Sequence, residues 1–140
     1  MYQRDYMLRM IEMIGDLISG ILGLIKKGKF EQASEELGRI YYDMLKQDSA
    51  FFKSIPAGEL TDRLLKDHNY TNGHLEILAE LFNAEAELEF ARGNEQGAAE
   101  FYEKSLILFE FIDREEKTLY PERIKKMDAI RNRIIMLHKK

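Results

Sequence analysis

Apolar residues return every three or four positions along nearly the whole chain, and this spacing constrains the fold more than any other feature. Three to four residues is the period of an α-helix, whereas a strand alternates every second residue. Only Pro56 and Pro121 interrupt the 140 residues, so long helices are permitted. No strand pattern occurs anywhere. The sequence therefore predicts an all-α protein, and its length is enough to bury a hydrophobic core as a single domain.

The expected helices are separated by glycine, proline and asparagine-rich turns. Gly28 and Gly93 each follow a long helix, and Pro121 suits the first turn of the last one. The connector at 48–56 is apolar enough to lie on the core. The predicted helices cover residues 2–26, 30–47, 57–67, 74–92, 95–113 and 120–138.

The first predicted helix is apolar on more faces than one amphipathic stripe can hold. A helix of this kind is buried on several sides, so we expect it to be the central helix or part of an oligomer interface. Gly15, Ser19 and Gly23 fall on one face. Small residues at this spacing allow close approach of another helix, which predicts tight packing there.

An internal repeat links the two halves of the chain. Gly28 and Gly93 lie 65 residues apart, and the same interval separates Ala33 from Ala98 and Leu37 from Tyr102. In each copy a long helix ends at the glycine and a second helix begins soon afterwards. The glycine turns the chain, and the small alanine lets the second helix cross close over the first.

This pattern resembles the tetratricopeptide repeat, a helix–turn–helix unit of about 34 residues. Ala98 with Tyr102 four residues later matches the family pattern, as do Phe82 and Ala86 in the preceding helix. The resemblance implies an α–α superhelix of two helical hairpins plus a connector helix and a C-terminal helix. Its expected parts within one domain, 1–140, are a hairpin at 2–47, a connector at 48–73, a hairpin at 74–113 and a terminal helix at 120–138.

Some positions depart from the repeat pattern. Glu85 and Glu89 stand where the family prefers apolar residues, and about thirty residues separate the two units. The opening segment, from Tyr2 to Glu12, also resembles the start of a family of short bacterial proteins classed as a domain of unknown function. That second resemblance implies a bacterial source and a helical fold, and no activity.

The residue inventory removes several chemistries. The chain has no cysteine, which excludes disulfides, thiolate metal sites and thiol nucleophiles. His68 and His74 flank one turn and would need Asp67 to approach a metal site, and we interpret them as exposed loop residues. No Glu-x-x-His pair and no nucleotide-binding glycine loop occurs. We expect no catalytic, cofactor or metal site, and hence no enzyme; the glutamates at 74–92 are interpreted as a solvated face.

Charge is unevenly distributed over a chain of net charge −4. Residues 120–140 carry a net charge of +5, and the remainder carries −9. The simplest interpretation is that the basic last helix packs on its own acidic protein. Nucleic acid is not an expected partner because the acidic body repels phosphates. No signal peptide or membrane span is expected either, because charges interrupt the apolar N-terminal stretch, and a cytoplasmic location fits.

Two functional hypotheses follow. The first is a non-catalytic protein–protein interaction module that accepts a basic or amphipathic protein or peptide on a groove. The repeat register places Glu80, Asn83, Glu87 and Phe90 on that groove. The alternative is a self-associating structural protein, a homodimer whose groove is filled by its own C-terminal helix. Its predicted self-association face consists of Gly15, Ile18, Leu22 and Ile25.

Overall fold

The computed structural model describes residues 2–117 and 120–139, with side chains from residue 6 onward. Within these residues the chain forms seven α-helices and one 3₁₀ turn, and no strand, which confirms the all-α prediction. The elements are α1 (Tyr2–Lys26), α2 (Phe30–Leu45), α3 (Ser49–Lys53), η1 (Ala57–Glu59), α4 (Leu60–Asp67), α5 (Asn72–Ala91), α6 (Glu95–Glu116) and α7 (Pro121–His138).

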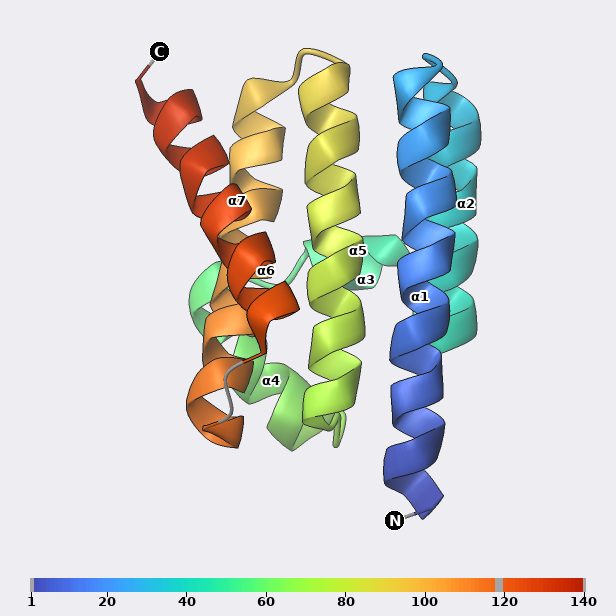
Figure 1. The fold of residues 1–140 in the computed structure, drawn as a ribbon, viewed down its shortest axis with the longest axis vertical. Coiled ribbons are helices and arrows are strands. Elements are labelled where there is room, and N and C mark those ends of the chain that lie inside the picture. Colours follow the sequence, from blue (N-terminus) through green and yellow to red (C-terminus); the bar gives the residue numbers. More distant parts are fainter. Residues whose placement is uncertain (1, 118–119, 140) are drawn as a thin grey trace.

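The five long helices stand side by side, and neighbours in sequence run antiparallel (Figure 1). As a result α1, α5 and α7 point in the same direction, with α1 and α7 on opposite sides of α5 in this view. The helix α2 lies behind α1, and the short α4 lies near the end where α5 begins. No helix of the described segments combines the length and apolar character that a membrane span needs.

The central helix of the bundle is α5. Apolar residues on all of its sides are buried, together with Glu80 and Glu85. The first helix, which was expected to be a central helix or part of an oligomer interface, buries Ile14, Ile18 and Ile21 but leaves other large apolar residues in solvent. The reason is that α1 packs on α2 and α5 only along one side, so its apolar excess remains on the surface.

Both hinge glycines adopt the backbone conformation that the sequence predicts. Gly28 has φ +77° and Gly93 has φ +87°, the left-handed region that glycine enters without penalty. Ala33 and Ala98, the small residues of the following helices, are completely buried. The repeated residues therefore have the roles that their spacing predicted: each glycine turns the chain, and each alanine lies in the contact between two helices.

Gly93→Ala is expected to lower the free energy of unfolding by about 1–2 kcal/mol, the cost of a left-handed residue with a side chain. An added Cβ would meet no atom within 4 Å, so the loss would come from backbone strain alone. Urea denaturation measures the change. Gly38→Ala, which lies inside α2 with the same open surroundings, is the control and should stabilise the protein by about 0.5–1 kcal/mol. Equal effects at both positions would contradict the strain argument.

The connector between the hairpins differs from its prediction in detail. The segment predicted as a connector, 48–56, contains α3, whose first turn is capped by the Asp48 side chain accepting a hydrogen bond from the Phe51 amide at 2.9 Å. Phe52 and Ile55 are buried, as expected for a connector that lies on the core. The helix expected at 57–67 begins as the turn η1, and α6 continues to Glu116, three residues past its predicted end.

Candidate functional site

The basic face of α7 lies over the acidic side of α5. Lys126 pairs with Glu80, and the Arg133 guanidinium lies 3.8 Å from the Glu87 carboxylate. The same guanidinium sits 4.5 Å from the centre of the Phe90 ring. Three of the four predicted groove residues are therefore in contact with basic side chains of α7, while the fourth, Asn83, is half-buried.

The glutamates of α5 are not a solvated face, which corrects the sequence interpretation. Glu80 and Glu85 are 6% and 5% exposed. Burial raises the pKa of Glu85, and Lys53, whose ammonium lies 3.4 Å away, opposes part of that rise. Glu87 accepts a hydrogen bond from the Tyr102 hydroxyl at 2.7 Å, and burial together with this bond raises the pKa of Tyr102. These carboxylates hold the helices together.

The predicted self-association face of α1 is divided between core and surface. Ile18 is buried, whereas Gly15, Leu22 and Ile25 are half-buried. A Cβ added at Gly15 or Gly23 would meet no atom within 4 Å. Within one chain, therefore, no other helix approaches α1 closely at these glycines, and the prediction of tight packing there is wrong. The reason is that α5 and α2 pack on neighbouring faces of α1.

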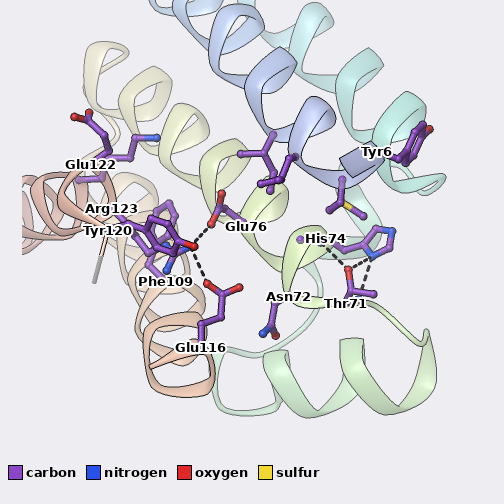
Figure 2. Close-up of a pocket in the computed structure, with 15 residues that line it drawn as sticks. Tyr6, Thr71, Asn72, His74, Glu76, Phe109, Glu116, Tyr120, Glu122 and Arg123 are labelled. Carbon is purple, nitrogen blue, oxygen red and sulfur yellow. Dashed lines mark hydrogen bonds and ion pairs between the residues drawn. The ribbon is translucent and has the colours of Figure 1, made fainter. Parts of the chain in front are cut away.

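A cleft of about 1000 Å³ opens between the first turns of α1 and α7. The N-terminus of α5 forms its floor, and the last turns of α6 contribute to the side below α7 (Figure 2). We call this feature the α1–α7 cleft. Its lining comprises Tyr6, Met7, Leu8 and Ile11 from α1, residues 71–74 and Glu76 from the start of α5, Phe109 and Glu116 from α6, and Tyr120, Glu122, Arg123 and Lys126 at α7.

Arg123 organises the α7 wall of the cleft. It is 8% exposed and donates to three carboxylates, with nitrogen–oxygen distances of 2.5 Å to Glu76, 2.9 Å to Asp113 and 3.3 Å to Glu116. Figure 2 shows its head between Glu76 and Glu116. Burial lowers the pKa of the guanidinium, but the carboxylates more than reverse this, so its net pKa is raised and its charge is fixed. One buried cation thus ties α7 to both α5 and α6.

The floor of the cleft is the capped N-terminus of α5. Thr71 caps α5, and its backbone amide donates to Nδ1 of His74 at 3.0 Å, which completes a capping box. Half-burial lowers the pKa of His74, which favours the neutral ring that this bond requires. A Cβ at Gly73 would overlap the Met7 side chain, so glycine permits α1 to approach here.

The two turn histidines have structural partners, which revises their interpretation as simple loop residues. His68 packs edge-on to Phe51 with ring centres 5.0 Å apart, and His74 stacks on Tyr70 at 4.8 Å. No cluster of three or more potential metal ligands occurs among the described residues.

The cleft has two chemically different walls. On the α1 side Tyr6 is 60% and Leu8 is 50% exposed, so an apolar surface faces solvent. The floor and the α7 side carry three carboxylates, Glu76, Glu116 and Glu122, and two cations, Arg123 and Lys126. Each of the two cations also pairs with a carboxylate outside the cleft lining, Arg123 with Asp113 and Lys126 with Glu80. The charge around this side is therefore negative. This arrangement suits a ligand that is apolar on one side and positively charged on the other.

Neither Arg123 nor the α1 side of the cleft was predicted from the sequence. Arg123, Lys126 and Arg133 recur at three and seven residues, which places them on one helix face, and this signal was present in the sequence. Tyr6 and Leu8 gave no such signal, because apolar residues surround nearly the whole of that helix.

No family model, no curated protein and no solved structure matches the chain.

Proposed function

We propose that this chain is a tetratricopeptide-like, non-catalytic interaction module whose α1–α7 cleft binds a basic amphipathic segment of another polypeptide. The observation that carries the proposal is the pairing of an exposed apolar wall with a negatively charged one across a single cleft of about 1000 Å³. Amphipathic helices are recognised by grooves of this kind, where apolar anchors enter the groove and the charged side meets its rim.

The cleft differs from the groove that the repeat register predicted. Basic residues of α7 already cover Glu80, Glu87 and Phe90, so a ligand at those positions would have to displace ion pairs within the chain. At the N-terminal end of the same helix row, the first turns of α1, α5 and α7 line the α1–α7 cleft instead of being covered by ion pairs of this kind along its whole length. The proposal therefore places the partner at this end.

A basic helical peptide is the direct probe. A fluorescent peptide of about 18 residues, or five helical turns, with leucines on one face and lysines elsewhere, should bind saturably and raise the fluorescence anisotropy. A peptide of the same pattern with glutamate in place of lysine should not bind. Added salt should weaken binding, because the rim charges are exposed to solvent.

Two cleft variants and one matched control locate the binding. Leu8→Lys puts a positive charge on the apolar wall and Glu122→Lys reverses one charge at the opposite wall, so each should raise the Kd at least about tenfold. Tyr42→Lys adds the same charge on α2 at a residue that is 62% exposed and outside the cleft, and it should leave the Kd unchanged. Binding of both peptides, or equal weakening by all three variants, would contradict the proposal.

A further inference from the structure

A second surface of α1, on the side of α2, is apolar and exposed. Tyr6, Met10, Met13 and Leu17 recur at intervals of four, three and four residues, the a/d spacing of a helix that pairs with another helix. Tyr6 and Met13 are 60% and 50% exposed and Leu17 is 36% exposed. We call these four residues the α1 stripe.

The α1 stripe lines one side of a groove rather than a flat surface. The groove holds about 420 Å³ between α1 and α2, and Ile40, Asp43 and Met44 line its α2 side. A helix that docked there would contact both α1 and α2. The groove is separate from the α1–α7 cleft except at Tyr6, which lies at the end of both.

The charges beside the stripe are self-complementary in one orientation only. When two copies of α1 pair antiparallel, Met10 of one lies opposite Met13 of the other, and Tyr6 lies opposite Leu17. Arg9 and Asp16, both exposed, occupy the same flank one heptad apart. In an antiparallel pair of helices, the same flank of each helix faces the same flank of the other. Arg9 of each copy therefore lies near Asp16 of the other, and the two-fold symmetry gives two such ion pairs.

A parallel arrangement does not use these charges. It sets the Arg9 flank of one copy against the opposite flank of the other, which carries Ile14 and Ile21. Those isoleucines are 0% and 2% exposed in the core of their own chain. Arg9 and Asp16 would then face no opposite charge on the α1 helix of the other copy.

We propose that the protein forms a two-fold homodimer in which the α1 stripes of two copies pair antiparallel, each entering the groove between α1 and α2 of the other. Such an interface is isologous, because the same patch serves both copies. The arrangement assembles a four-helix contact from α1 and α2 of each chain. It shares only Tyr6 with the lining of the α1–α7 cleft, and dimerisation does not require that cleft to be occupied.

Sedimentation of the full chain over a range of concentrations tests the dimer. The wild-type protein should be a dimer at micromolar concentration, and Met13→Lys should make it monomeric while its helical circular dichroism is unchanged. Tyr42→Lys, an equally charged change at an exposed residue outside the groove, should remain dimeric. A wild-type monomer at 100-fold higher concentration, or a dimeric Met13→Lys protein, would overturn the proposal.

A charge swap tests the orientation. Arg9→Asp and Asp16→Arg should each weaken dimerisation at least tenfold, because each variant sets like charges against each other twice. The double variant restores both pairs in reversed order and should recover the wild-type association to within a few-fold. A heterologous partner on this surface would show no such recovery, so failure of the double variant to dimerise would overturn the antiparallel pairing.

The absence of cysteine permits a further test of orientation. In the antiparallel register two Asp16→Cys residues lie about 13 Å apart along the axis, from the rise of 1.5 Å per residue, which is too far for a disulfide. Mixing Arg9→Cys and Asp16→Cys proteins should instead give an oxidised heterodimer. Efficient crosslinking of Asp16→Cys alone would overturn the antiparallel register.

Discussion

Replacing Arg123 with alanine is expected to lower the free energy of unfolding by about 3–5 kcal/mol, the cost of removing one partner from a buried ion pair. The guanidinium is 8% exposed and holds three carboxylates that come from α5 and α6. Without it, Glu76, Asp113 and Glu116 would repel one another in a partly buried space. The contact between α7 and the rest of the bundle would lose its central polar link.

Urea denaturation at neutral pH measures this loss. Arg131→Ala is the matched control, because Arg131 also forms ion pairs from α7, with Glu110 and Asp128, but is 43% exposed. It should cost about 1 kcal/mol or less. The double variant Arg123→Ala with Glu76→Gln should recover part of the loss, since it removes one of the repelling charges. Equal losses for Arg123→Ala and Arg131→Ala would contradict the role of the buried cluster.

The pairing of α5 with α7 shows how far sequence reasoning reaches here. Glu76, Glu80 and Glu87 recur at intervals of four and seven residues, and Arg123, Lys126 and Arg133 at intervals of three and seven, so each set lies along one helix face. The charge imbalance of the last helix predicted its packing on an acidic body, and the ion pairs agree with that prediction. The register of the pairing was not predictable, because it requires knowing that α5 and α7 run in the same direction.

The identity of the central helix was the harder problem. Both α1 and α5 are apolar on several faces, but α5 also contains five glutamates, which favoured a solvated interpretation. In the structure Glu80 and Glu85 are buried against lysines of other helices, so their charge is compensated by tertiary contacts that lie far away in sequence. Sequence pattern shows which residues are polar, whereas their burial depends on partners that only the fold brings close.

The α1–α7 cleft could not be predicted for a related reason. Its walls come from four helices, and no single segment shows a motif for it. The hinge glycines and the antiparallel helix pairs, which place α1, α5 and α7 side by side, were predicted from the sequence. The cleft depends on how the first turns of these helices pack, and that packing is set by side chains from four helices rather than by a local pattern.

Phe82→Ala is expected to destabilise the protein by about 3–5 kcal/mol, as large aromatic truncations in a core do. The Phe82 ring is completely buried, and its centre lies 5.8 Å from that of Phe101 on α6. Removal of the ring would leave a cavity between α5 and α6, the most extensive helix contact in the bundle. Urea denaturation of the single variant measures the loss directly.

Phe90→Ala, two turns further along the same helix, is the matched control. Phe90 is half-buried and its ring is covered by Arg133, which is itself 38% exposed. Its truncation should cost only about 1 kcal/mol, from a cation–π contact and partial burial. The contrast separates two roles of α5: one face makes the core with α6, and the other receives the charged face of α7. A loss at Phe90 as large as at Phe82 would contradict this contrast. Because Met127, Ile130 and Leu137 of α7 are buried in the core, α7 is held by apolar packing as well as by its ion pairs, among which those of Arg123 are the most buried.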